Sequence, residues 1–244
     1  SFGVCVVLDY LVKEYFQDAL WLSEALVKTP RNTIGTTLGR IAASGLETIA
    51  NFFKTLLGHL FYFISATWGF GAICIVLIIS CVFMFFKRRS DIAAAIKADR
   101  EAAEEYLTEN EAILSLFSFF FMGAVFVVSV VFKCTSTVID ERVDTMIYGR
   151  YTEVFYPIAI YTALVLLYRG KLSIIHTFAA MCCASVICLL TKIFTAPAVV
   201  AGTRMVSGMI LGIAPMRYGE GLKDLPTDAT FVKIIATVMV MLFV

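Results

Sequence analysis

Long, uninterrupted apolar runs constrain the fold of this chain more than any other feature of its sequence. The longest covers residues 172–215, and shorter ones cover residues 60–86, 112–132, 154–168 and 229–244. A helix needs about 20 apolar residues to cross a bilayer, and its backbone polar groups must be paired internally. Because these runs are continuous rather than alternating, they predict membrane-spanning helices rather than the strands of a barrel.

The composition indicates the same class of protein. Apolar residues make up 60% of the 244 residues and charged residues 16%, whereas soluble domains average about 45–50% and about 25%. The sequence therefore predicts an all-α, polytopic helical membrane protein with about five or six membrane helices. The net charge of +1 gives no electrostatic indication of nucleic-acid binding.

The N-terminal part of the chain differs from the rest. Within residues 1–58, apolar side chains recur at helical spacing between charged ones, and Pro30 separates two such segments. Amphipathic helices of this kind lie at a membrane interface, against partner subunits, or on the protein's own surface. We expect residues 59–244 to form the helical membrane domain, with a charge-rich extramembrane helix at residues 90–111.

The run at residues 172–215 is longer than one membrane span requires. It forms either two ordinary spans that meet near Pro197, or one long helix kinked there, because proline removes an intrahelical hydrogen bond. No polar cluster surrounds Pro197, which favours the long, steeply tilted helix carrying Arg204. The run also contains His176 and Lys192, and a charge at the bilayer centre costs about 2.5–3.5 kcal/mol.

Small residues surround Arg204. On a helix Ala201, Gly208 and Gly212 fall close to one stripe beside it, and Gly208-x-x-x-Gly212 is a small-residue packing motif. Arg204 is either functional or a side chain that extends to the membrane surface. We expect the side chains of Lys192 and Lys233 to extend to the membrane surface in this way. We treat four further residues as candidates for a polar pathway: His176, Lys192, Ser207 and Lys233.

Motifs for catalysis are missing from the sequence. It contains no P-loop, no G-x-G-x-x-G, no H-E-x-x-H and no G-x-S-x-G. Its seven cysteines form no C-x-x-C pair and it has only two histidines, so we expect no metal site and no cofactor. The chain begins at Ser1 and ends inside an apolar run at Val244, as a processed or truncated product would.

The segment around Arg204 resembles subunit a of the rotary F-type ATP synthases. The sequence Arg204-Met205-Val206-Ser207-Gly208 is followed by Gly212, at the family's spacing from the arginine, and Pro197 precedes it. Gly208 stands where the family has Asn, and Ile213 stands where it has His or Glu. The resemblance covers about residues 174–244, without the Q-A-[YF]-V-F signature of the family's last helix.

This resemblance implies a function and a location. Arg204 would face a c-type rotor ring and separate two proton half-channels, in a membrane subunit of ATP synthase in the mitochondrial inner membrane. The implied partners are that ring, other membrane subunits and the lipid bilayer, without nucleic acid. The alternative is a non-catalytic structural or assembly subunit of a large organellar membrane complex. A small channel or a viral membrane protein is a third reading, which no specific residue supports.

Overall fold

The computed structural model describes residues 34–98, 110–140, 146–147, 151–201 and 227–243. Within these ranges the protein is helical and contains no strand, which confirms the all-α class for this part of the chain. The helices are α3 (Ile34–Ala66), α4 (Phe70–Ala98), α6 (Asn110–Asp140), α7 (Tyr156–Tyr168), α8 (Ile174–Leu190), α9 (Ala196–Val200) and α10 (Asp228–Phe243).

Three helical stretches in the described residues are long and apolar enough to cross a membrane: Phe70–Lys87, Glu111–Cys134 and Ile174–Val200. These lengths and compositions support a membrane protein. Two of the expected spans are shorter, because α7 has 13 residues and α10 has 16. The expected count of five or six membrane helices is therefore not reached in the described part of the chain.

The chain divides into two compact units, Ser1–Gly39 and Arg40–Val244, and all packing discussed below lies within the second. The expected boundary at residue 58 falls inside α3, which runs on to Ala66. Gly45 interrupts the helical geometry of α3 with a φ of 53°. The first of the two amphipathic segments, which precedes Pro30, lies outside the described residues.

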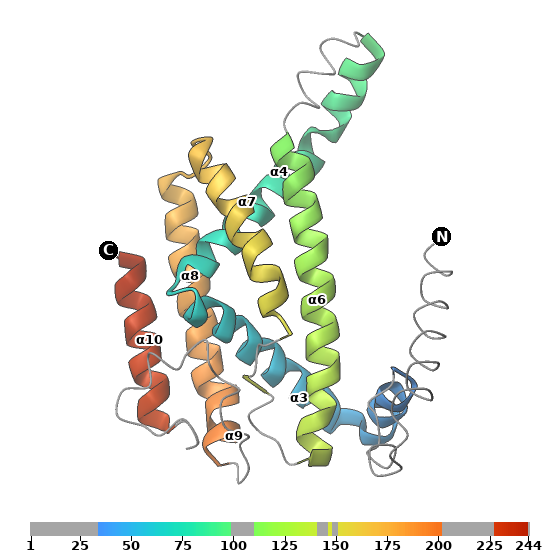
Figure 1. The fold of residues 1–244 in the computed structure, drawn as a ribbon, viewed down its shortest axis with the longest axis vertical. Coiled ribbons are helices and arrows are strands. Elements are labelled where there is room, and N and C mark those ends of the chain that lie inside the picture. The colour runs from blue at the N-terminus through green and yellow to red at the C-terminus, as the bar shows by residue number, and fades with distance from the viewer. Residues whose placement is uncertain (1–33, 99–109, 141–145, 148–150, 202–226, 244) are drawn as a thin grey trace, which may run out of the picture. The chain divides into compact units, whose positions relative to one another are not determined.

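A turn divides the apolar run at residues 60–86, so the prediction of one helix there is wrong. α3 ends at Ala66 and α4 begins at Phe70 (Figure 1). Gly69 has a φ of 90°, and a Cβ atom on it would lie 2.8 Å from Cγ of Leu242 in α10. The turn thus depends on a glycine, because only a residue without a side chain lets α10 approach this closely. Gly69 and Leu242 are far apart in the sequence.

α4 continues without a break through the basic residues 87–89 to Ala98. The first part of the expected helix at residues 90–111 is therefore an extension of α4 and not a separate element. Residues 99–109 lie outside the described part of the chain. α4 packs against α6, α7 and α8.

The sequence Arg169-Gly170-Lys171, between two apolar runs, predicts a tight turn, and the structure confirms it. Gly170 has a φ of 69°, its N–H donates to the carbonyl of Leu167 at 2.9 Å, and the N–H of Lys171 donates to the carbonyl of Leu166 at 3.0 Å. This pattern of bonds is a Schellman motif, which satisfies the last carbonyls of α7. α8 begins directly after the turn and packs against α10 (Figure 1).

The helix from Ile174 to Val200 does not reverse near Pro197, as predicted. A π-helical turn, Thr191–Thr195, connects α8 to α9 just before that proline. Proline cannot donate to the carbonyl four residues earlier, and a π-turn is one of the ways a helix accommodates such a gap. The helix ends at Val200, before Arg204, which lies outside the described residues.

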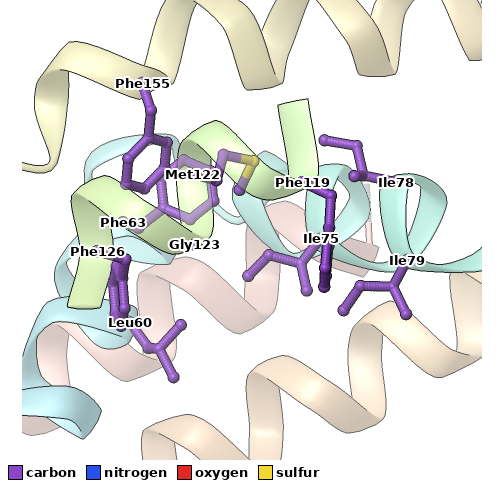
Figure 2. Close-up of a pocket in the computed structure, with 10 residues that line it drawn as sticks. All are labelled: Leu60, Phe63, Ile75, Ile78, Ile79, Phe119, Met122, Gly123, Phe126 and Phe155. Carbon is purple, nitrogen blue, oxygen red and sulfur yellow. The ribbon is translucent and has the colours of Figure 1, made fainter. Parts of the chain in front are cut away.

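Buried apolar side chains form two clusters in the described residues. One joins the end of α3 to α8 and α10, and the other joins α4, α6 and α7. Between α3, α4 and α6 lies a cavity of about 160 Å³ that is lined only by apolar residues (Figure 2). The described residues that line this cavity offer no polar group to a ligand.

Candidate functional site

The polarity of α3 is reversed relative to a helix on the surface of a soluble protein. Five polar residues recur on it at intervals of three or four, so they share one face, and all five are buried. We call this set the α3 polar stripe: Thr48, Asn51, Thr55, His59 and Tyr62. On the opposite face Leu46, Ile49 and Phe53 are exposed by 84%, 52% and 57%. Apolar side chains outside and polar ones inside are the arrangement expected in hydrocarbon.

Tyr62 connects the α3 polar stripe to the start of α7. Its hydroxyl donates a hydrogen bond to Oε1 of Glu153 at 2.5 Å. Tyr62 is fully buried, whereas Glu153 is exposed in a short 3₁₀ turn that leads into α7. The hydroxyls of the neighbouring Thr152 and Tyr156 lie 3.3 Å apart. A polar connection thus runs from an exposed carboxylate to the buried end of the stripe.

His59 is the titratable residue in the middle of this region. It is fully buried, and its Nδ1 lies 3.4 Å from Oγ of Ser129 in α6. Its ring stands edge-on to Phe126, with ring centroids 6.2 Å apart. Farther along the stripe, the hydroxyls of Thr48 and Thr55 are buried with no hydrogen-bond partner among the described residues. Buried hydroxyls of this kind are sites for bound water.

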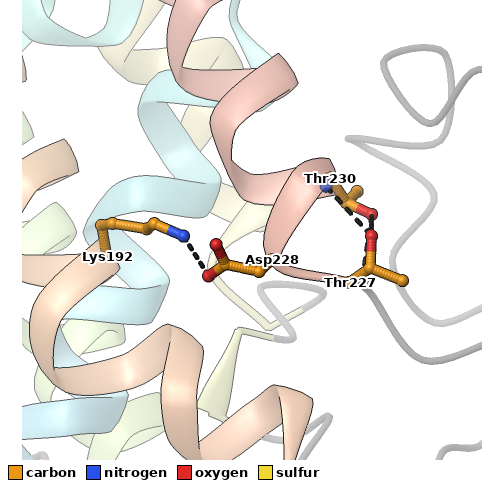
Figure 3. A network of polar contacts seen from close by, with 4 residues as sticks. All are labelled: Lys192, Thr227, Asp228 and Thr230. Carbon is orange, nitrogen blue, oxygen red and sulfur yellow. Dashed lines mark hydrogen bonds and ion pairs between the residues drawn. The ribbon is translucent and has the colours of Figure 1, made fainter.

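Lys192, which we expected to extend to the membrane surface, instead forms an ion pair with Asp228 (Figure 3). The side chain of Lys192 is 26% exposed and that of Asp228 is 71% exposed. Asp228 lies in the first turn of α10, where a carboxylate also interacts favourably with the helix dipole. Thr227 and Thr230 cap this helix through reciprocal bonds from backbone N–H to hydroxyl, at 3.0 and 3.2 Å.

The π-turn that carries Lys192 is joined directly to α3. The Thr191 hydroxyl donates to the carbonyl of Leu57 at 3.2 Å, and the Thr195 hydroxyl donates to the carbonyl of Lys54 at 2.9 Å. A π-helix returns to nearly the same face after four residues, so both threonines meet the same neighbour. These bonds fix the register between α3 and the end of the long helix.

His176 is hydrogen-bonded at the start of α8. Its Nε2 lies 2.9 Å from Oγ of Ser80 in α4, and its Nδ1 accepts from the N–H of Ser173 at 3.2 Å. The hydroxyl of Ser173 in turn accepts from the N–H of His176, which completes a capping box. His176 and Lys192 are 16 residues apart on one helix, or about 24 Å at 1.5 Å per residue. The structure therefore does not bring these two candidates together.

The remaining candidates are separate or lie outside the described part of the chain. Ala201 is exposed and follows the last residue of α9. Lys233 is exposed on α10, and its carbonyl accepts a bond from the Thr237 hydroxyl at 2.9 Å. Four candidates fall in residues 202–226, outside the described residues: Arg204, Ser207, Gly208 and Gly212.

Among the polar contacts between helices that sequence reasoning missed, two involve glutamates that it did not select as candidates. One is the pair of Tyr62 and Glu153. The other is Glu111, whose Oε1 lies 3.2 Å from Nε of Arg169 and whose Oε2 lies 3.5 Å from Nζ of Lys171. Glu111 is largely buried at the start of α6. The sequence contained part of this information, because each of these two glutamates stands at one end of an apolar run. It did not identify the partner of either glutamate, because that partner is remote in sequence.

Among the described residues no three histidine, cysteine, aspartate or glutamate side chains are grouped so that they could hold a metal ion. No protein-family model, curated protein or solved structure matches the chain. The resemblance to subunit a of rotary ATP synthases therefore rests on the residues around Arg204 alone.

Proposed function

We propose that this chain is a proton-conducting membrane subunit, and that the α3 polar stripe and Glu153 form its proton path. The observation that carries the proposal is the reversed polarity of α3, together with the bond from buried Tyr62 to exposed Glu153. Polar side chains inside a membrane protein are costly, and they commonly mark an ion or proton pathway. The stripe extends over four turns of helix, more than a local packing contact requires.

The chemistry of the stripe suits protons. Glu153 is exposed and can exchange a proton with solvent, and the Tyr62 hydroxyl can pass one inward. The His59 imidazole has two ring nitrogens, so it can accept a proton on one and release a proton from the other. Water held by the hydroxyls of Thr48 and Thr55 would extend the path along α3.

A narrower form of the proposal is a subunit of a rotary ATP synthase in the mitochondrial inner membrane. Arg204 would then face a carboxylate on a c-type rotor helix, and its positive charge would favour proton release from that carboxylate. Ala201, Gly208 and Gly212 would let the rotor helix approach closely. The support for this form is the sequence motif around Arg204.

The alternative is a non-catalytic structural subunit of a large organellar membrane complex. The observation that favours it is the exposure of three aromatic side chains on α6, Phe117, Phe119 and Phe120, by 56%, 39% and 62%. Gly123 on the same helix has open space beside it. Another membrane subunit could pack against these aromatic side chains as readily as lipid could.

Proton flux into liposomes tests the general proposal. The full chain is reconstituted, and flux is driven by a potassium gradient with valinomycin and measured with an entrapped pH-sensitive dye. We expect Tyr62→Phe and Glu153→Gln each to reduce the flux several-fold. Tyr161→Phe, which removes the hydroxyl of an exposed tyrosine on α7, is the matched control. Wild-type flux in both path variants would reject the α3 path and favour the structural subunit.

The test of the ATP synthase form of the proposal uses the assembled complex in membrane vesicles. We expect Arg204→Ala to abolish proton pumping while the complex still assembles. Arg204→Lys should also be weak, because a desolvated lysine can lose its proton whereas arginine keeps its charge. Leucine at Gly208 or Gly212 should impair pumping, because its bulk would push the rotor helix away. Full pumping by Arg204→Ala would reject the ATP synthase form without affecting the α3 path.

A further inference from the structure

The polarity of α6 is reversed in the same way as that of α3. Residues 112–128 contain two polar side chains, Ser115 and Ser118, and both are fully buried. Glu111 lies just before this stretch and is 9% exposed. Spacings of four and three residues place these three side chains on one face of the helix. We call Glu111, Ser115 and Ser118 the α6 polar row.

The α6 polar row lies against α7 and the turn that follows it. Oγ of Ser118 lies 2.6 Å from Oγ1 of Thr162 in α7, which is also fully buried. Glu111 forms ion pairs with Arg169 and Lys171 in the turn, whose side chains are 63% and 48% exposed. The row thus leads from charged groups at the protein surface to a buried pair of hydroxyls.

Ser115 stands between Glu111 and that pair of hydroxyls. Its own hydroxyl is buried with no hydrogen-bond partner among the described residues. Helix packing does not account for it, because a serine that joins two helices bonds across their interface, as Ser118 does. A buried hydroxyl without a protein partner is a site for a bound water molecule, which would supply the missing bond.

We propose that the α6 polar row is the second end of the proton path, with Glu111 at its mouth and water bound at Ser115. This assignment rests on the proposed function, which places the first mouth at Glu153. Glu153 precedes α7 and Arg169, the partner of Glu111, follows it (Figure 1). The two carboxylates therefore lie at opposite ends of one helix. A path across a membrane needs an opening at each face, and these carboxylates supply both.

The apolar cavity in Figure 2 lies between the two polar segments. On α6 it is lined by Met122, one turn after Ser118, and by Phe126, whose ring stands edge-on to His59. Its volume of about 160 Å³ is many times the space that one water molecule requires, about 10–15 Å³. Hydrophobic constrictions gate channels by losing their water. In this path a proton crosses the cavity only when water enters it, so the cavity limits the flux.

Proton flux into liposomes containing the full chain tests this second end of the path. Ser115→Ala removes the unpaired hydroxyl, and its matched control, Ser185→Ala, removes a hydroxyl on α8 that bonds within its own helix. Glu111→Gln removes the carboxylate, whereas Arg169→Gln breaks the same ion pair and leaves the carboxylate. Met122→Gln makes the cavity wall polar with little change in side-chain length. Thermal unfolding in detergent is measured for every variant.

We expect Ser115→Ala and Glu111→Gln each to lower the flux several-fold, and Met122→Gln to raise it. Ser185→Ala should conduct like the wild type, and Arg169→Gln should lose less flux than Glu111→Gln. The thermal midpoint of Ser115→Ala should equal or exceed that of the wild type, because the substitution breaks no bond within the protein. A loss of flux in this variant would therefore not come from unfolding.

Three results would overturn parts of this assignment. Wild-type flux in Ser115→Ala and Glu111→Gln, with reduced flux in Tyr62→Phe, would reject the α6 polar row and leave the α3 path standing. Equal losses in Glu111→Gln and Arg169→Gln would reject Glu111 as the mouth, because the ion pair would then account for both. Unchanged flux in Met122→Gln would reject the cavity as the gate. Reduced flux in the row variants with full flux in Tyr62→Phe would support the row and reject the α3 path.

Discussion

Tyr62 in α3 and Glu153 before α7 are 91 residues apart in sequence, and the tyrosine hydroxyl donates to the carboxylate at 2.5 Å. The bond joins a fully buried group to an exposed one. It fixes the end of the α3 polar stripe against the N-terminal end of α7.

The first prediction concerns the stability that this bond provides. Tyr62→Phe removes only the hydroxyl and should lower the free energy of unfolding by about 1 kcal/mol. The cost stays at that level because exposed Glu153 regains water when its partner is lost. Thermal unfolding in detergent measures the change, with Tyr161→Phe as the control. Glu153→Gln should cost less, because the amide oxygen still accepts the bond; a larger loss in Glu153→Gln would contradict this account.

The second prediction is an asymmetry between the partners of the ion pair in Figure 3. Asp228→Asn should cost about 1 kcal/mol, because it leaves the partly buried side chain of Lys192 without its carboxylate and weakens the interaction with the α10 dipole. Lys192→Met should lie within about 0.5 kcal/mol of wild type, because the carboxylate left behind is solvated. Thermal unfolding of both single variants and the double variant measures the coupling. A larger loss of stability in Lys192→Met than in Asp228→Asn would show that Lys192 is solvated.

The third prediction concerns the close approach of Gly58 to the chain at Met146. A Cβ atom on Gly58 would lie 2.1 Å from the Met146 carbonyl oxygen, so the backbone would have to move. We expect Gly58→Ala to lower the free energy of unfolding by about 1–3 kcal/mol. Gly123→Ala, at a helical position with open space, should be neutral or stabilising by up to about 1 kcal/mol. Equal thermal midpoints for the two variants would contradict the packing at Gly58.

The fourth prediction concerns the turn between α7 and α8. Gly170 has open space around it but a φ of 69°, so any cost of substitution comes from the backbone conformation alone. Gly170→Ala should cost about 1 kcal/mol, and Gly170→Asn should cost less, because asparagine tolerates the left-handed region. Thermal unfolding of both variants provides the comparison. An alanine variant as stable as wild type would mean that the turn changes conformation without cost.

Local sequence determined the helical class, the approximate positions of α6 and α7, and the turn at residues 169–171, although α6 continues past the predicted end at residue 132 to Asp140. Continuous apolar runs favour helices because only a helix pairs its backbone groups within one segment. Gly170 identified the turn because glycine enters the left-handed region freely. The lack of a loop-forming polar cluster around Pro197 correctly indicated that the helix does not reverse there. Each of these features depends on residues within a few positions of one another.

Tertiary structure alone decided the features that join distant segments. The break between α3 and α4 depends on Gly69 meeting Leu242, and Lys192 obtains its partner from a helix that begins 36 residues later. The inward direction of the α3 polar stripe was not evident from sequence either. A helical period shows that polar residues share a face, but which face is buried depends on whether water or lipid surrounds the helix and on the neighbours that cover it.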